Sequence, residues 1–278
     1  MTDPVDASHT HAARSASPLP VAVVIPAKDE SARIAETVAS AWQIPGVTLV
    51  VVVDDGSTDA TADRASKAGA RVVSHSRNFG KATAMATGAQ EVMRIETYSS
   101  RNRGTHILMF LDADLGQTAR AAAPLIDPVA AGDADFTIAV LPPQQGAAGH
   151  GRVLHAARHA IERTTGFHAL APLSGQRCMT RAAFEAALPF AGGWGVEVGM
   201  TIDLLVKGFT VQEVLCDLTH RPSGRDMAGQ VHRARQLRDV LRAVAVRRAR
   251  HVTVHARNRS GMPSLPYQPY KATRSHAQ

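Results

Sequence analysis

Residues 21–59 read VAVVIPAKDESARIAETVASAWQIPGVTLVVVVDDGSTD, and this stretch decides the fold. Two apolar runs, Val21–Ile25 and Leu49–Val53, each end at polar residues, as buried parallel strands do. Between them, apolar residues recur at helical spacing over residues 31–42. A strand, a helix and a second strand in this order predict a parallel sheet covered by helices.

The alternation of strands and helices continues along the chain. Further strands are predicted at Arg71–Ser74, Ile107–Leu111, Phe136–Leu141 and Phe209–Leu215. Further helices are predicted between Ser57, as its N-cap, and Gly69, and at Lys81–Arg94, Arg152–Thr165, Val196–Lys207 and Val231–Arg250. We therefore expect an α/β fold with a mostly parallel, Rossmann-like sheet flanked by helices, and a helical C-terminal extension.

Composition divides the chain into a body, a basic segment and two tails. Residues 1–19 and 259–278 are low in apolar content and are expected to be disordered. Residues 20–227 are expected to form the globular domain, and residues 228–258 a basic amphipathic helix.

The 278 residues are 45% hydrophobic and 20% charged, which excludes wholesale disorder. No apolar run approaches the roughly 20 residues of a membrane-spanning helix. Residues 1–20 lack the apolar core of a secretory signal, so we expect a cytoplasmic protein. Two cysteines, Cys178 and Cys216, suit ordinary core thiols better than a disulfide framework or a metal site.

The net charge of +7 comes from the end of the chain, because residues 228–278 hold 11 Lys or Arg and a single acidic residue. The remaining chain then carries 20 basic and 23 acidic residues. The helix predicted at 231–250, with Leu237, Leu241 and Val244 on one face, most simply packs on the body or on a second subunit. Contact with an anionic membrane surface is the next alternative. A nucleic-acid partner is not expected, because no aromatic residues interleave with the basic ones.

Acidic residues follow three of the predicted strands, in Pro26–Glu30, Asp54–Ser57 and Asp112–Asp114. The carboxyl ends of parallel strands meet at one edge, where like charges repel unless a ligand is bound. A divalent cation with a nucleotide would explain all three segments together. Asp112 and Asp114, as alternate residues, can both turn toward one metal, which would neutralise a departing nucleoside diphosphate.

Two common nucleotide-binding signatures are absent from the sequence. No Gly-x-Gly-x-x-Gly follows the first strand, which argues against a dinucleotide-dependent dehydrogenase. Asn78–Lys81 is too short to be a Walker-type phosphate loop.

Four motifs resemble the nucleotide-binding half of GT-A-fold glycosyltransferases of the family 2 type: VVIPAKDE (23–30), VVDDGSTD (52–59), GKATAM (80–85) and FLDADL (110–115). The second half is similar to the glucosyl-3-phosphoglycerate synthases in Gly151–Val153, Pro172–Gly175, Pro189-Phe190, Gly195–Gly199 and His220-Arg221. The resemblance covers roughly residues 20–240 and divides the domain into a nucleotide-binding half, 20–117, and an acceptor half, 118–227.

The resemblance implies a role for each matching residue. The nucleotide-binding positions would be Pro26, Ala27, Glu30, Asp55, Lys81, Asp112 and Ala113. The metal ligands would be Asp114 and His220, and the acceptor positions Gly151, Arg152 and Ser174. The catalytic set would be Asp112, which supports the donor, Glu197, which holds sugar hydroxyls, and Leu173, whose carbonyl faces the reacting sugar.

The chain departs from the synthases mainly in the acceptor half. Leu154 stands where they carry a hydroxyl residue, Pro222 where they carry Asn, and Ser174–Arg177 replaces a Gly-Gly-Glu-Tyr-like stretch. The donor half of the resemblance is therefore the better supported.

What the resemblance implies is a homodimeric hexosyltransferase that depends on Mg²⁺ or Mn²⁺. It would transfer glucose from UDP-glucose, with retention, to a small anionic acceptor such as 3-phosphoglycerate. Two alternatives stay open. One is a polyprenyl-phosphate sugar transferase that uses GDP-mannose or UDP-glucose, which the basic helix would suit. The other is a sugar-nucleotide-binding protein without catalysis, against which the intact Asp112-x-Asp114 counts.

Overall fold

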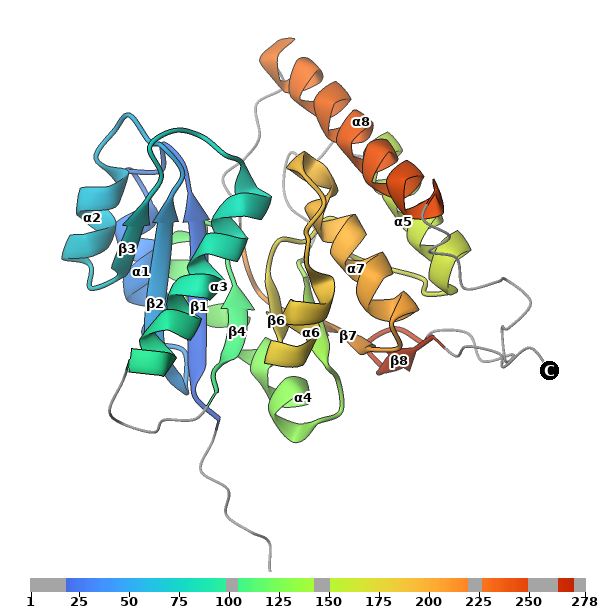
Figure 1. Ribbon diagram of the computed structural model, residues 1–278, viewed down its shortest axis with the longest axis horizontal. Coiled ribbons are helices and arrows are strands. Elements are labelled where there is room, and N and C mark those ends of the chain that lie inside the picture. Colours follow the sequence, from blue (N-terminus) through green and yellow to red (C-terminus); the bar gives the residue numbers. More distant parts are fainter. Residues whose placement is uncertain (1–18, 99–104, 143–150, 220–226, 250–264, 273–278) are drawn as a thin grey trace, which may run out of the picture.

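A single mixed sheet runs through the whole body of the protein (Figure 1). The computed structural model describes residues 19–98, 105–142, 151–219, 227–249 and 265–272. Its strands are β1 (Val21–Ala27), β2 (Val47–Asp54), β3 (Arg71–Ser74), β4 (Ile107–Phe110), β5 (Phe136–Val140), β6 (Arg177–Met179), β7 (Thr210–Leu215) and β8 (Tyr270–Lys271). They lie in the order β3-β2-β1-β4-β6-β5-β7-β8, with β6 and β8 antiparallel to their neighbours.

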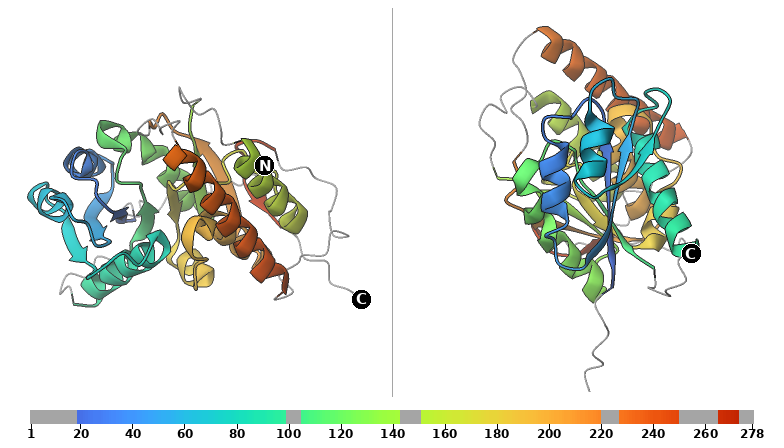
Figure 2. Two further views of the ribbon diagram at one scale, coloured as in Figure 1. Left: turned by 90° about the horizontal axis from the view of Figure 1, so that it is seen from above. Right: turned by 90° about the vertical axis from the view of Figure 1, so that its left-hand side faces the viewer.

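Helices cover both faces of this sheet (Figure 2). One face carries α1 (Ile34–Ala41), α2 (Thr61–Lys67), the 3₁₀ helix η1 (Gly116–Leu125) and α4 (Ile126–Ala131). The other carries α3 (Lys81–Tyr98), α5 (Gly151–Thr165), α6 (Arg181–Ala187), α7 (Val196–Val206) and α8 (Met227–Ala249). A short 3₁₀ helix, η2 (Gly193–Gly195), precedes α7.

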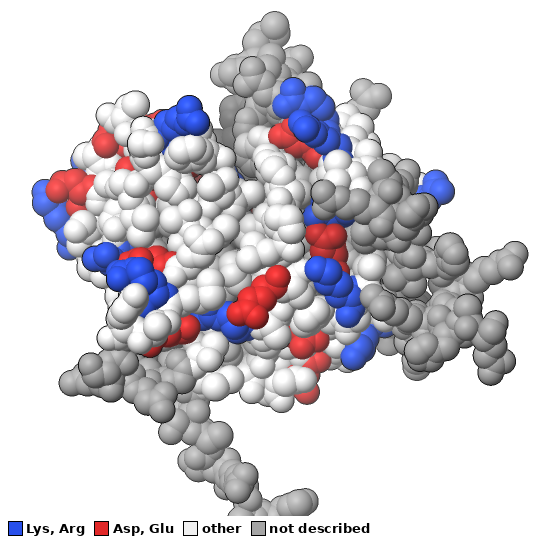
Figure 3. Space-filling model, viewed as in Figure 1, with Lys and Arg blue, Asp and Glu red and all other residues white. Residues whose placement is uncertain are grey.

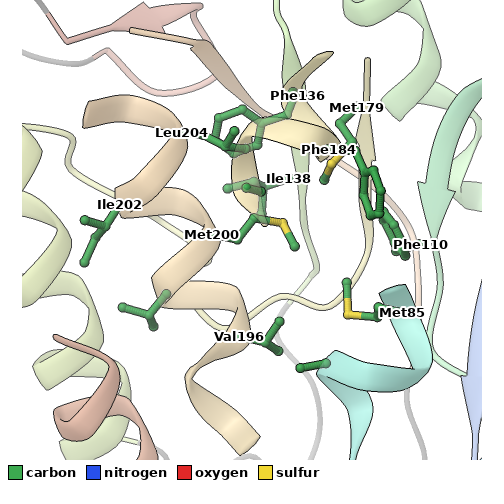
Figure 4. Packing of buried hydrophobic residues seen from close by; sticks show 14 of the residues in the cluster. Met85, Phe110, Phe136, Ile138, Met179, Phe184, Val196, Met200, Ile202 and Leu204 are labelled. Carbon is green, nitrogen blue, oxygen red and sulfur yellow. The ribbon is translucent and has the colours of Figure 1, made fainter. Parts of the chain in front are cut away.

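Alternation along the strands divides the core into two halves. In β1, Val21, Val23 and Ile25 pack under one layer of helices, and Ala22 and Val24 under the other. The strands therefore read as continuous apolar runs, as strands buried on both faces do. The half beneath α7 contains the phenylalanine and methionine side chains of Figure 4.

Helix α3 lies unusually close to the sheet because of a glycine. A Cβ atom at Gly88 would collide with Val24 of β1. This close contact holds the start of α3, at Lys81, beside the carboxyl ends of β1 and β2.

Every strand and helix predicted from the sequence is present. The N-cap prediction is wrong, because α2 begins at Thr61 after Ala60, while the Ser57 hydroxyl accepts a hydrogen bond from the backbone N–H of Asp29. Not predicted from the sequence are β6 and β8, α4 and α6, and the two 3₁₀ helices η1 and η2, most of which are short. Strand β6 also begins with an arginine, a residue that seldom starts a buried strand.

Part of the predicted C-terminal tail is ordered. Residues 265–272 lie within 259–278, and their strand β8 pairs with β7. Tyr270 stabilises the pairing, since its hydroxyl donates to the carbonyl of Thr165 at 2.8 Å and its ring packs on Phe167. The contacts of Tyr270 thus hold this segment on the body, although the segment contains few apolar residues. The predicted tail at 1–19 falls almost wholly outside the described residues.

The basic helix α8 packs on the body, beside α5 and α7 (Figures 1 and 2). A Cβ atom at Gly195 would lie only 2.6 Å from the Cβ of Ala243, so the helix backbone comes very close to η2. Its buried apolar residues include Val240 and Val244, whereas Leu241 is 53% exposed. The prediction that Leu241 belongs to the packing face is therefore wrong, and its neighbour Val240 packs there instead.

A buried ion pair fixes α8 to α7. The guanidinium of Arg247 donates to both carboxylate oxygens of Asp203, with Nε 2.8 Å from Oδ1. Arg247 is 7% exposed, so part of the positive charge that the sequence assigned to this helix serves packing.

None of the described helices combines the length and apolar character needed to cross a bilayer. On the face in Figure 3, basic and acidic side chains lie together in several small groups. Cys178 and Cys216 are both buried and unbridged, as expected of core thiols.

Replacing Arg247 with Leu should lower the free energy of unfolding by about 2–4 kcal/mol, because Asp203 would keep a buried charge without its partner. Urea unfolding monitored by circular dichroism measures this loss. Lys67→Leu is the matched control, since Lys67 pairs with Asp63 on the exposed surface of α2 and should contribute less than about 1 kcal/mol. Equal losses in the two variants would contradict the packing of α8 on α7.

Candidate active site

Hydrogen bonds join the loops that follow β1 and β2. The backbone N–H of Asp29 donates to Ser57 Oγ at 2.9 Å, and that of Thr58 donates to Asp29 Oδ1 at 2.8 Å. The backbone N–H of Glu30 donates to Thr61 Oγ1 at 2.9 Å. Asp29 has a left-handed φ of 54°, a conformation that these contacts must stabilise. These hydrogen bonds thus connect the carboxyl end of β1, where Pro26 and Ala27 lie, to the carboxyl end of β2.

Asp55, at the end of β2, holds the loop that leads to α3. Its carboxylate accepts from His75 Nδ1 at 2.7 Å, from the backbone N–H of Phe79 at 2.8 Å and from that of Gly80 at 2.7 Å. Burial alone would raise the pKa of Asp55, but these hydrogen bonds outweigh it and hold the pKa below its usual value. This predicted nucleotide contact therefore also positions the residue after Gly80, which is Lys81.

Three predicted residues from distant parts of the chain meet at the carboxyl edge of the sheet. Lys81 Nζ lies 2.7 Å from Asp112 Oδ1 and 2.9 Å from Glu197 Oε1. Asp112 follows β4, whereas Lys81 and Glu197 come from the first turns of α3 and α7. We call these three residues the Lys81 cluster. Solvent reaches it, because the side chains of Lys81 and Asp112 are 24% and 25% exposed.

The charges within the Lys81 cluster stabilise one another. Burial favours the neutral amine of Lys81, but the attraction of Asp112 and Glu197 is stronger and raises the pKa of the lysine. Lys81 is therefore a permanent cation between two carboxylates at neutral pH. Such a set of fixed charges can bind a polar ligand with little reorganisation.

The loop before β6, residues 169–176, completes this site and is called the β6 loop. Gln176 Nε2 donates to Asp112 Oδ2 at 2.7 Å, and Ser174 Oγ donates to Gln176 Oε1 at 3.1 Å. A Cβ atom at Gly175 would lie 2.6 Å from Lys81 Nζ and 2.7 Å from the Asp112 carboxylate, so a larger residue here would displace this ion pair. No role was predicted from the sequence for Gln176 or Gly175. Their position directly after the predicted site residues Leu173 and Ser174 could have indicated that they belong to the site.

Two charged residues hold the β6 loop from behind. Arg158 of α5 donates to the carbonyls of Ala169 and Leu170 at 2.7 and 3.0 Å. The carboxylate of Glu213, on β7, accepts from the backbone N–H groups of Leu170 and Ala171 at 2.9 and 2.7 Å. Burial raises the pKa of Glu213, which these amides and nearby arginines offset only in part. Neither residue was singled out from the sequence.

The chain after β4 is held by α1. Thr37 Oγ1 donates to the carbonyl of Ala113 at 2.8 Å, and Arg33 Nη1 donates to that of Asp114 at 3.0 Å. These bonds engage backbone atoms of Ala113 and Asp114, while the side chain of Asp114 is half-buried. The Asp114 carboxylate thus follows Asp112 at the same edge of the sheet.

Some predicted site residues cannot be placed with the others. His220 lies outside the described residues, as does the side chain of Arg152, although its neighbour Gly151 opens α5. Among the residues that the structure describes, no three His, Cys, Asp or Glu side chains are grouped to hold a metal ion.

Comparison with known proteins identifies relatives of this arrangement. The family model described as glycosyl transferase family 2 matches residues 22–187. Glucosyl-3-phosphoglycerate synthase of Mycolicibacterium paratuberculosis is 31% identical over 200 residues, which are 66% of this chain and 59% of the synthase. Glycosyltransferase AglJ of Haloferax volcanii is 28% identical over 214 residues, or 76% of this chain and 66% of that protein. The chain thus spans about 60% of the length of the curated synthases it matches.

Solved structures show the same fold. Glucosyl-3-phosphoglycerate synthase from Mycobacterium tuberculosis, in complex with Mn²⁺, UDP and glucosyl-3-phosphoglycerate, superimposes with a TM-score of 0.61 at 27% identity, covering 81% of this chain and 80% of that one. A complex of the same synthase with Mg²⁺ and UDP gives 0.62 at 27% identity, covering 82% and 79%. The α/β sheet described above is therefore a GT-A-like fold, as predicted. Because the family model matches more than half of its length, this chain belongs to glycosyl transferase family 2.

Proposed function

We propose that this protein is a hexosyltransferase that moves glucose from UDP-glucose, with retention of configuration, to a small anionic acceptor such as 3-phosphoglycerate. One observation carries the proposal: the Lys81 cluster joins Asp112 and Glu197 at the carboxyl edge of the sheet. The similarity to synthases solved with UDP, Mn²⁺ and phosphoglyceric acid supports the choice of substrates.

The donor would lie along the edge formed by β1, β2 and β4. Pro26, Ala27 and Glu30 would border the nucleoside, beside the hydrogen-bonded loops that follow β1 and β2. Asp112 and Glu197 offer acceptors for sugar hydroxyls, which are donors as well as acceptors. Lys81 supplies a positive charge to a diphosphate, whose negative charge would otherwise meet an acidic edge.

The acidic edge fits a divalent cation through Asp114. Asp112 is hydrogen-bonded to Lys81 and Gln176. The resemblance of the Asp112-x-Asp114 motif to the family assigns the metal to the Asp114 carboxylate, with His220 as the second protein ligand. Mg²⁺ and Mn²⁺ accept oxygen ligands, and Mg²⁺ in particular is often held by one or two carboxylates together with substrate phosphates. When bound, the cation would neutralise negative charge on the departing diphosphate.

The transfer breaks the bond between sugar C1 and the diphosphate oxygen and forms a bond between C1 and the acceptor hydroxyl oxygen. The hydroxyl proton passes to the departing diphosphate, on the face from which the acceptor enters. In this scheme Glu197 and Asp112 hold the sugar, and the carbonyl of Leu173 faces it from the β6 loop. Lys81 keeps both carboxylates oriented throughout.

The acceptor would bind between the β6 loop and the start of α5, where Ser174, Gly151 and Arg152 are found. A guanidinium can bind a phosphate or carboxylate through two parallel hydrogen bonds, which suits a small anion such as 3-phosphoglycerate. This part of the proposal depends on the synthase-like motif at Gly151-Arg152.

The deciding experiment incubates the purified protein with radiolabelled UDP-glucose, Mn²⁺ and 3-phosphoglycerate, and separates glucosylated acceptor from free glucose and UDP. Formation of both UDP and a glucosylated acid supports the proposal. Turnover only with polyprenyl phosphate would instead support the lipid-linked alternative. Thermal stabilisation by UDP-glucose without turnover on any acceptor would support a binding protein, and about 2.7 kcal/mol is expected at 100 times the dissociation constant.

Asp114→Ala should reduce metal-dependent turnover by about 100-fold, because the proposed cation would lose its described protein ligand. Turnover measured across a Mn²⁺ titration, with a chelator arm, checks this. The control is Asp133→Ala, an exposed carboxylate between α4 and β5, which should leave turnover unchanged. Full activity of Asp114→Ala at low Mn²⁺ would contradict the metal assignment.

Gly175→Ala should lower kcat/KM by at least about tenfold, since the added methyl would force Lys81 away from Asp112. Steady-state kinetics with UDP-glucose measures the effect, and the melting temperature should change by no more than a few degrees. Gly192→Ala serves as the control, because a Cβ atom there meets no atom within 4 Å. Unchanged kinetics in Gly175→Ala would show that the cluster tolerates the displacement.

A further inference from the structure

Arg177 places a fully buried guanidinium directly behind the active site. It is the first residue of β6 and is 0% exposed, between Phe110 of β4 and Ile138 of β5. Because β6 runs antiparallel to both neighbours, its first residue lies at the edge where they end. That edge is the one that carries the Lys81 cluster.

The Arg177 side chain connects two parts of the site. Its Nε donates to the carbonyl of Ser174 at 3.0 Å, and its Nη1 donates to Thr201 Oγ1 at 2.9 Å. The Thr201 hydroxyl in turn donates to the carbonyl of Glu197 at 2.9 Å. A single planar group therefore links the β6 loop to the first turn of α7, which carries Glu197.

The burial of the Arg177 charge is, by itself, unfavourable for the stability of the fold. Nη2 of Arg177 is buried and has no hydrogen-bond partner within the described part of the chain. Burial lowers the pKa of Arg177 to about 10, and attraction from Glu197, Glu213 and Asp112 offsets only part of that effect. The charged form is thus less favourable here than in the unfolded chain. Because the described contacts of the Arg177 side chain are with a carbonyl and a hydroxyl and not with a carboxylate, an apolar side chain in its place would leave no direct ionic partner unpaired.

A buried charge that costs stability is expected where it contributes to activity. We propose that Arg177 is a positioning residue of the active site, which fixes the β6 loop relative to Glu197 for sugar transfer; this inference rests on the proposed function. Arg177 acts through Ser174 and Thr201 and does not touch the substrates. The residue lies in Ser174–Arg177, where the chain departs from the synthase-like pattern.

The test uses Arg177→Met, which removes the charge and all donors at similar length. We expect an equal or higher melting temperature, and amide hydrogen exchange in residues 169–176 at least about tenfold faster. We expect kcat to fall by at least about 30-fold with KM for UDP-glucose within about threefold, because the donor edge at β1 and β2 is untouched.

Arg181→Met is the matched control. Arg181 also has buried nitrogens, Nε and Nη1, without partners among the residues that the structure describes. Its Nη2 pairs with Glu96 at 2.9 Å near the opposite edge of the sheet, next to His106. Its loss should lower the melting temperature, because Glu96 loses a charged partner, while kcat and exchange in residues 169–176 stay unchanged.

Two results would overturn the inference. One is a lower melting temperature of Arg177→Met with unchanged kcat per folded molecule, which would make Arg177 an ordinary structural residue. The other is unchanged hydrogen exchange in the β6 loop, which would show that Arg177 does not hold it. The exchange measurement needs no turnover, so it still decides the linkage if the wild-type protein fails to transfer glucose and the proposed function falls.

Discussion

The structure of the site depends on one cation, the ammonium of Lys81, between two carboxylates. Asp112 and Glu197 are 85 residues apart in the sequence (112 to 197), and like charges brought together at a sheet edge would repel. Lys81 contacts both at less than 3 Å and makes their proximity favourable. The surrounding features serve that geometry: Gly88 lets α3 approach the sheet, Asp55 holds the residue before Lys81, and Gly175 leaves room for the ion pairs.

The donor half of this site could be anticipated from the sequence because its parts follow apolar strands directly. Asp55 and Asp112 come immediately after β2 and β4, so strand position alone predicts which edge they reach. Gln176, Arg177 and Glu213 could not be predicted in this way. Gln176 precedes and Arg177 begins a three-residue antiparallel strand, while Glu213 lies on β7, far along the chain. Their roles arise from contacts that leave no local pattern.

The buried charged residues of this protein differ in how completely their polar atoms are hydrogen-bonded. Arg247 has the Asp203 carboxylate as a complete partner and fixes one helix to another. Glu213 is satisfied by backbone amides and supports a loop. Arg177 is the least satisfied of the three, yet it lies closest to the Lys81 cluster through Thr201 and Ser174. Of these three residues, the least satisfied one thus lies next to the site.

The close packing of α8 against η2 and α7 has a consequence for the order in which the protein matures. Chains fold from the N-terminus during synthesis, and β1 to β4 with their helices pair mainly with one another. The helix that carries Glu197 packs instead on Ala243 and Arg247, which leave the ribosome much later. A growing chain therefore acquires the edge for the nucleotide well before Glu197 is held in place, and its active site is completed only after α8 has been made.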